Sequence, residues 1–122
     1  MLAPNESCHR VGGGAPANLK LRPAKEKLNP PGISILIGGT PAQAASDMRR
    51  VFGPNSTLGK KASIVGTVEI AKIQDAGFDV IEDSSSHFPN HGRLIHSIEG
   101  VAGFSDENLK RLAQVFTNHT GL

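Results

Sequence analysis

The sequence predicts an α+β fold, or a small α/β fold, with one central sheet of about four strands covered by three or four helices. The length of 122 residues is typical of one domain, and 38% apolar residues are enough for one hydrophobic core. β-favouring runs alternate with segments of helical periodicity, and no internal repeat interrupts this order. Phe is the only aromatic residue type, so the core must be mainly aliphatic.

Two regions of different composition divide the chain. Residues 1–31 are expected to form a flexible leader, because five prolines within residues 3–32 and a glycine run at 12–14 disfavour regular structure. Residues 32–122 are expected to form the compact domain. The leader is mildly basic and carries Arg10, Lys20, Arg22, Lys25 and Lys27 against Glu6 and Glu26. Such an arm either attracts phosphate weakly or is simply solvated.

The compact domain begins with a strand and a helix. The strand at residues 33–37, ISILI, has apolar side chains on both faces, which is typical of an interior strand. Two glycines end it. A helix is predicted at 41–52, because Thr40 can serve as N-cap and Gln43 follows three positions later, the spacing of a capping box. Gly53 is expected to end this helix.

The middle of the chain is predicted to contain two helices and a strand. Residues 56–66 give the weakest secondary-structure signal in the chain. They fit either a short helix or an irregular strand, and we assign them to helix. A helix at 67–77 follows, capped by Thr67 and ended by Gly77 in the left-handed conformation. A strand at 78–82 comes directly after it.

The C-terminal part is predicted to be a hairpin and a helix. Alternating apolar residues at 93–104 indicate two strands around a turn at Glu99 and Gly100. The last helix, at 105–116, starts at Ser105 as N-cap, with acidic residues in its first turn.

Several features limit the classes of protein. No run approaches the roughly 20 apolar residues that span a bilayer, and the N-terminus lacks the apolar core of a secretory signal. We therefore expect no membrane partner, and the compartment stays open. The single Cys8 cannot form an internal disulfide. The absence of Trp and Tyr disfavours the stacking of bases on aromatic platforms.

The stretch SSSHFPNHGRLIHS at residues 84–97 holds three of the five histidines and is the best candidate site. His87 and His91 have a spacing that would join two imidazoles at a metal ion on a helix, but Pro89 lies between them and disfavours that helix. We predict no metal and no cofactor. In the plainest interpretation, these histidines belong to a turn.

The alternative interpretation of residues 84–97 is a site for acid-base catalysis. Two histidines beside a cationic arginine are the groups that metal-independent cleavage of a phosphodiester requires. His91 and Arg93 share a face if the strand begins early, whereas His96 faces the other way. The candidate catalytic residues are His91, Arg93, His96 and His87. For His96, a hydrogen-bonded position in the core is the alternative.

A second candidate is the strand-to-helix turn ILIGGTPAQ. Gly38, Gly39 and Thr40 precede a helix N-terminus whose backbone N–H groups could hold a phosphate or carboxylate. The spacing matches neither a dinucleotide fingerprint nor a Walker A loop, and the glycines could simply permit a tight turn. Lys60 and Lys61 could also approach an anion.

The segments PPGISILIGGTPAQAASDMRRVF, AGFDVI and NHGRLIHSIEGVAGFSDENLKRL resemble the small C-terminal toxin domains of bacterial polymorphic toxins and secretion-system effectors. The resemblance covers roughly residues 30–116 and assigns no role to an individual residue. Many such domains are metal-independent ribonucleases, and others are ADP-ribosyltransferases or NAD-cleaving enzymes. This chain lacks the Glu-x-Glu or Gln-x-Glu pattern of the transferases. The resemblance implies an immunity protein as partner.

Three functional hypotheses follow. The first is a toxin-like ribonuclease, with RNA or a nucleotide as substrate, in which His91 and His96 act as acid and base and Arg93 stabilises the developing charge. The second is a protein-interaction module without catalysis. The third places a nucleotide phosphate on residues 38–40, as in an NAD-using toxin.

Overall fold

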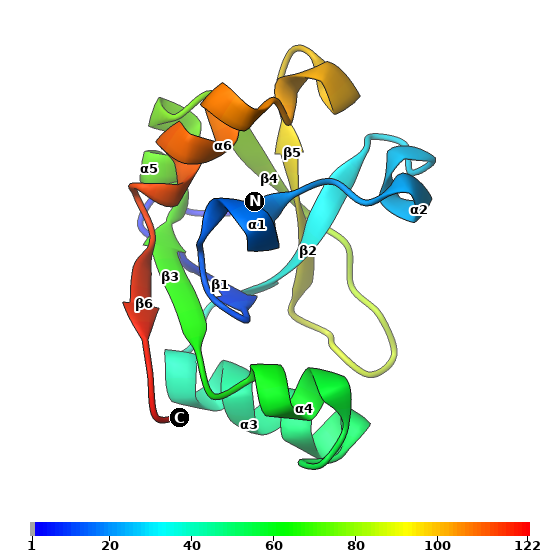
Figure 1. Cartoon of the computed structure of the whole chain (residues 1–122), viewed down its shortest axis with the longest axis vertical. Helices are drawn as coiled ribbons and strands as arrows, with labels where there is room; N and C mark the ends of the chain where they lie inside the picture. The colour runs from blue at the N-terminus through cyan, green and yellow to red at the C-terminus, as the bar shows by residue number, and fades with distance from the viewer. Residues whose placement is uncertain (1) are drawn as a thin grey trace.

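The computed structural model describes residues 2–122, which form a mixed α+β fold around one antiparallel sheet (Figure 1). The strand order is β4-β5-β2-β1-β3-β6. The strands are β1 (Ser7–Val11), β2 (Gly32–Ile37), β3 (Val65–Glu69), β4 (Phe78–Glu82), β5 (His91–His96) and β6 (Thr117–His119). The helices are α1 (Pro16–Leu19), α2 (Pro23–Glu26), α3 (Pro41–Phe52), α4 (Thr57–Lys61), α5 (Ile70–Asp75) and α6 (Asp106–Ala113), with a 3₁₀ turn, η1 (Gly100–Gly103).

The expectation of about four strands and three or four helices is wrong, since residues 2–122 contain six strands and six α-helices. Strands β1 and β6 have the sequences SCHRV and TNH, which lack an apolar alternation. They form because their backbone groups complete the ladder on either side of β3. β3 itself takes the first residues of the helix expected at 67–77, so α5 begins only at Ile70.

The expected hairpin at 93–104 is also corrected. Its first strand is part of β5, but the second is replaced by η1. Gly103 packs so closely on His96 that a Cβ atom there would lie 2.0 Å from the ring. The chain therefore folds back over the imidazole instead of continuing as a strand.

Several local predictions are confirmed. The Thr40 hydroxyl accepts from the backbone N–H of Gln43, and the Gln43 side chain accepts from the N–H of Thr40, so the capping box of α3 is complete. Ser105 caps α6 by accepting from the N–H of Asn108. Gly77 has a φ of 92° at the end of α5. The short α4 lies within the segment 56–66, for which a helix is predicted.

The leader region takes part in this fold. Residues 7–11 form β1 between β2 and β3, and the short helices α1 and α2 follow (Figure 1). Cys8 and His9 of β1 are buried, as is Leu19 of α1. The hydrogen-bond ladder to β3 holds this polar strand inside the sheet.

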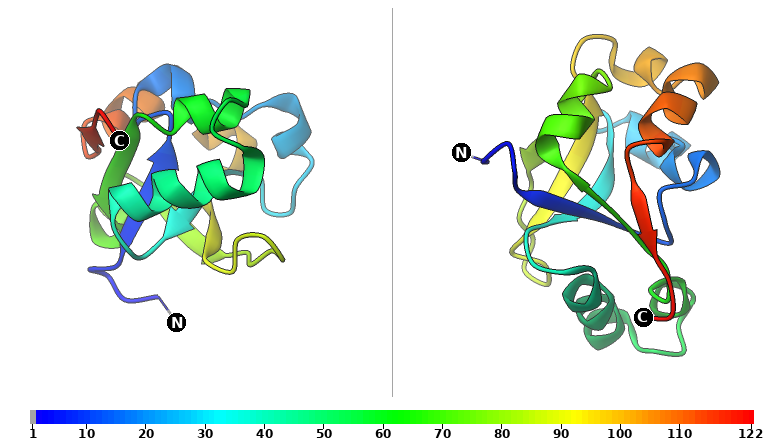
Figure 2. Two further views of the ribbon diagram at one scale, coloured as in Figure 1. Left: turned by 90° about the horizontal axis from the view of Figure 1, so that it is seen from below. Right: turned by 90° about the vertical axis from the view of Figure 1, so that its left-hand side faces the viewer.

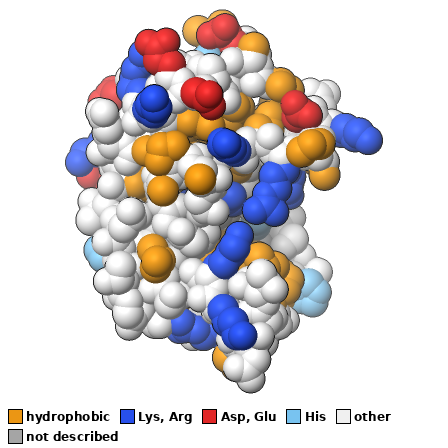
Figure 3. All heavy atoms as spheres, in the orientation of Figure 1, with side chains coloured by type: hydrophobic (Ala, Val, Ile, Leu, Met, Phe, Trp, Pro, Cys, Tyr) orange, Lys and Arg blue, Asp and Glu red, His pale blue; other side chains and the backbone are white. Residues whose placement is uncertain are grey.

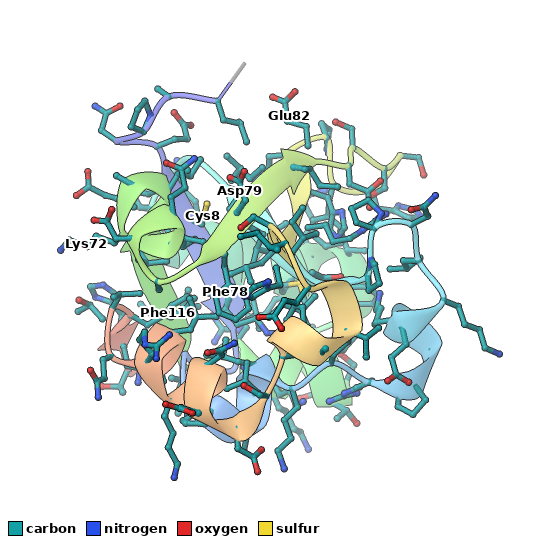
Figure 4. The ribbon with its side chains drawn as sticks, turned by 90° about the horizontal axis from the view of Figure 1, so that it is seen from above. Cys8, Lys72, Phe78, Asp79, Glu82 and Phe116 are labelled. Atoms are coloured by element: carbon teal, nitrogen blue, oxygen red, sulfur yellow. The ribbon has the colours of Figure 1, made fainter. Side chains whose placement is uncertain are left out.

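The buried residues form two hydrophobic cores. The helices that belong to them, α5 and α6 for one and α3 and α4 for the other, lie at opposite ends of the molecule (Figure 2). The larger core joins sheet residues to α1, α5 and α6, and the smaller core joins α3 and the end of α4 to the sheet. Phe78 lies inside the larger core, edge-on to Phe104, whereas the side chains of Lys72 and Glu82 point outward (Figure 4). No helix in residues 2–122 is long and apolar enough to cross a bilayer.

The two halves of the sheet separate near its centre. β1 pairs with β3 from Ser7 to Val11, whereas its pairing with β2 joins Cys8 to Ile37 and His9 to Leu36. Beyond these pairs the two strands diverge, and the opening between them is the origin of the cleft described next.

Candidate functional site

A cleft of about 590 Å³ opens where β1 and β2 diverge. It is bordered by residues of α1, of the α1–α2 region, of α3 and α4, and of the loop at 84–90. Figure 3 shows Lys and Arg side chains gathered in a line across this face of the molecule, next to apolar side chains. Its volume lies within the range of small-ligand sites.

The cleft is strongly basic. Among the described residues that line it, five are cationic and one, Asp83, is acidic. The cations are Arg10, Lys20, Arg22, Lys25 and Lys61. Four of them come from the leader region, so the folding of that region onto the sheet concentrates its positive charge in one place. Such a concentration attracts anions, above all phosphates.

Arg10 lies half-buried where the strands part. Its Nε donates to the carbonyl of Asn18 at 3.0 Å, and its guanidinium donates to the carbonyl of Ser34 at 2.8 Å. No carboxylate in the described chain forms an ion pair with it. Burial lowers the pKa of Arg10 to about 10, and the positive charge of Arg22 acts in the same direction. An anion bound here would supply the missing countercharge.

His91 also lines the cleft, and its ring orientation is set by Asp83. Its Nδ1 lies 2.8 Å from the backbone carbonyl of Asp83 and 3.6 Å from that residue's carboxylate. Because a carbonyl oxygen only accepts, Nδ1 carries the hydrogen and Nε2 of the neutral ring carries the lone pair. The arrangement is that of a base held in one tautomer by a second group.

Arg93 shares the strand face of His91 but is held away from the cleft. Its guanidinium donates to the Asp83 carboxylate at 2.9 Å and to the carbonyl of Pro30 at 2.8 Å. The described residues that line the cleft do not include it. Arg93 therefore links Asp83, which precedes the loop at 84–90, to Pro30, which precedes β2. The charge of Arg93 is balanced by Asp83.

His96 lies on the opposite face of β5 from His91 and Arg93. Its Nδ1 accepts from the backbone N–H of Glu99 at 3.0 Å and, more weakly, from that of Ile98 at 3.4 Å. The ring meets Phe78 edge-on, with centroids 4.9 Å apart. The structure thus separates His96 from the other candidate catalytic residues. Its ring caps the turn that follows β5 and packs against the core.

The loop at 84–90 brings His87 to the cleft. His87 is exposed and lines the same cavity as His91. Phe88 anchors the loop, because it is buried and because its backbone N–H and carbonyl bond to Ser85. Of the four candidate catalytic residues, the structure brings His87 and His91 to one cavity.

The turn at Gly38, Gly39 and Thr40 is occupied by the protein's own contacts. The carbonyls of both glycines accept from Nε2 of the buried His9, at 3.1 and 3.2 Å. The N–H of Thr40 is engaged in the capping box, and the N–H of Gly38 donates to Ser7. A carboxylate oxygen of Glu6 lies close to Gly38. These contacts leave few donors and no excess of positive charge for a phosphate.

His9 and Cys8 lie beneath this turn, in β1. Nδ1 of His9 accepts from the hydroxyl of Thr67 at 2.9 Å, and burial lowers the pKa of the ring although the two glycine carbonyls oppose this. Burial raises the pKa of Cys8 to about 12, and the charge of Glu6 adds to the effect. Within residues 2–122, no group of three or more His, Cys, Asp or Glu side chains is arranged to hold a metal ion.

Arg10 is the functional candidate that sequence reasoning did not single out. The signal in the sequence was the excess of basic residues in the leader, together with Lys61 in the weakly predicted segment 56–66. The pattern did not show that these residues converge, because convergence depends on β1 entering the sheet. No family model, no curated protein and no solved structure gave a significant match to the chain.

Proposed function

We propose that this chain is a small toxin-like or effector-like domain that binds RNA through its phosphates in the basic cleft and cleaves it without a metal ion. The observation that carries the proposal is Arg10, a half-buried cation without a carboxylate partner in the described chain, in a cleft lined by four further cations. A phosphodiester is the ligand that this charge pattern favours.

The chemistry assigned to the site is transfer of a phosphoryl group to the neighbouring 2′-hydroxyl. Nε2 of His91 takes the proton from that hydroxyl, the 2′-oxygen attacks phosphorus, and the bond to the 5′-oxygen breaks. His87 gives a proton to the leaving oxygen, and Arg10 with Lys25 stabilises the charge on the phosphoryl oxygens. The products are a 2′,3′-cyclic phosphate and a 5′-hydroxyl.

This assignment differs from the one expected from the sequence. Arg10 replaces Arg93 as the cation at the phosphate, because Arg93 is balanced by Asp83. His87 replaces His96 as the second acid-base residue, because His96 caps a turn on the other face of β5. His91 remains one of the two, now with the role of base.

A substrate with one modified position tests the reaction. An oligoribonucleotide should be cleaved in EDTA, and the same oligomer with 2′-deoxyribose at the cleaved position should be bound but not cut there. His91→Gln should lower the cleavage rate about 100-fold or more with little change in binding. His119→Gln is the matched control, since His119 lies on β6 and does not line the cleft. An inert wild-type protein, or activity that requires a divalent ion, would exclude the proposal.

A second candidate function is binding without catalysis. It is favoured by the exposed position of His87 and by the engagement of Arg93 with Asp83, which together leave His91 as the one positioned base among the described candidates. In that case the same oligomer binds and remains intact. If the chain is a toxin-like domain, we expect an immunity protein to present carboxylates to the cleft and to compete with RNA for it.

A further inference from the structure

One wall of the basic cleft is apolar and carries two exposed side chains. Phe52, at the end of α3, is 44% exposed, and Leu58, in α4, is 41% exposed. Both line the cleft together with Met48 and Phe88. Large apolar side chains that border a cavity are costly to leave in water, and they mark the part of a ligand site that receives an apolar group.

The aromatic part of this wall is held in place. The rings of Phe52 and Phe88 are stacked, with centroids 5.9 Å apart and planes inclined by 27°. Phe88 is 8% exposed, and its carbonyl accepts from the backbone N–H groups of Ser85 and His91, both at 3.0 Å. The buried ring of Phe88 therefore supports the ring of Phe52, which is 44% exposed at the cleft.

The cleft thus joins two kinds of surface in one cavity. Arg10, Lys25 and Lys61 offer positive charge, while Phe52 and Leu58 offer apolar surface that includes an aromatic ring. A sugar phosphate or an inorganic phosphate would use the first surface and leave the second in water. A molecule with an aromatic ring linked to a phosphate uses both.

We infer that the stacked pair Phe52 and Phe88 is a platform for a nucleobase, and that it makes the cleft selective for nucleotides over other phosphates. The inference that the ligand has a phosphate rests on the proposed function. The inference that it has a base rests on the aromatic wall of the cleft. The absence of Trp and Tyr argues against aromatic platforms in general, but the fold gathers two of the five phenylalanines at this cavity. Stacking on Phe requires only the π-face that every base has.

Calorimetric titration of the whole chain with AMP, UMP, ribose 5-phosphate and pyrophosphate tests the inference. AMP should bind about tenfold more tightly than ribose 5-phosphate, the difference that one stacked base contributes. Phe52→Ala should remove this preference and leave the affinity for ribose 5-phosphate unchanged, which also shows that the variant is folded. Ile98→Ala is the matched control, because Ile98 is 88% exposed and does not line the cleft.

A fluorescence readout locates the base directly. The chain contains no Trp or Tyr, so Phe52→Trp introduces a single strong fluorophore into the wall. AMP should quench its emission, and ribose 5-phosphate at equal occupancy should not. A short oligoribonucleotide that displaces AMP would identify RNA as a source of the base, and one that does not would restrict the platform to free nucleotides.

The possible failures are distinct. Equal affinities for AMP and ribose 5-phosphate in the wild-type protein would contradict the nucleobase platform but remain consistent with a phosphate site in the cleft. The platform is overturned in the same way if Phe52→Ala keeps the preference for AMP. If none of the four ligands binds, both the platform and the proposed function are wrong.

Discussion

The guanidinium of Arg10 donates a hydrogen bond of 2.8 Å to the backbone carbonyl of Ser34, across the point where β1 and β2 separate. Lys25 lies 3.5 Å from the hydroxyl of the same serine. Two cations from the N-terminal region are therefore held at one residue of the central strand. Because like charges repel, this arrangement favours the binding of an anion between them.

Replacement of Arg10 by Met should weaken the binding of pyrophosphate and of oligoribonucleotides at least tenfold, since one charge-assisted contact contributes about 1.5–3 kcal/mol. The increase in melting temperature that these ligands cause in the wild-type protein should shrink accordingly. Arg50→Met is the control, because Arg50 is exposed and paired with Asp47 outside the cleft. Equal affinities of the two variants would show that Arg10 does not meet the ligand.

Asp83→Asn should lower the free energy of unfolding by about 1 kcal/mol, because it leaves the mostly buried Arg93 without its countercharge; partial exposure of Asp83 limits the loss. Denaturant unfolding measures the difference, which should shrink in high salt. The variant keeps the backbone carbonyl that orients His91, so the ring should keep its tautomer. Asp47→Asn, which breaks an exposed pair with Arg50, should cost less than about 0.5 kcal/mol.

The stability of the protein should depend on pH through His9. Burial lowers the pKa of this ring below its ordinary 6.5, so the unfolded chain takes up the proton at a higher pH than the folded chain does. The contribution of His9 is therefore complete above about pH 6.5 and is lost as the pH falls below it, by at most about 1.4 kcal/mol per pH unit.

Unfolding curves at pH 7.5, 6.5 and 5.5 measure this contribution. His9→Gln should show a shallower loss of stability on acidification than the wild-type protein, whereas the exposed His87→Gln should not differ from it. If His9→Gln and the wild-type protein lose stability in parallel, the buried imidazole is not the group that titrates.

Cys8 should be unreactive in the folded protein. A pKa of about 12 in place of 9.0 leaves roughly a thousandfold less thiolate near pH 8, and burial also blocks access of the reagent. Alkylation by iodoacetamide should be slow in buffer and fast in denaturant, as measured by mass spectrometry. Rapid labelling of the native chain would mean that β1 leaves the sheet.

Elements with local signals could be predicted from the order of residues. The apolar run of β2 has side chains on both faces, the capping box of α3 is a contact between Thr40 and Gln43, and the N-cap of α6 is a contact between Ser105 and Asn108. Each of these signals involves residues at most a few positions apart, so the pattern of residues is enough to find it. The sequence predicted a hairpin from residue 93 and a shared face for His91 and Arg93 only if its first strand begins early; β5 does begin earlier, at His91.

The remaining strands and the composition of the cleft depend on contacts between distant parts of the chain. SCHRV and TNH become β1 and β6 because neighbouring strands present unpaired backbone groups, and no side-chain pattern encodes that pairing. Entry of β1 into the sheet then places Arg10 beside Ser34 and brings Lys61 and His91 to the same cavity. Residues far apart in the sequence become neighbours only through this ladder of long-range hydrogen bonds. The histidine stretch and the basic residues were therefore each visible in the sequence, but their convergence on one cavity was not.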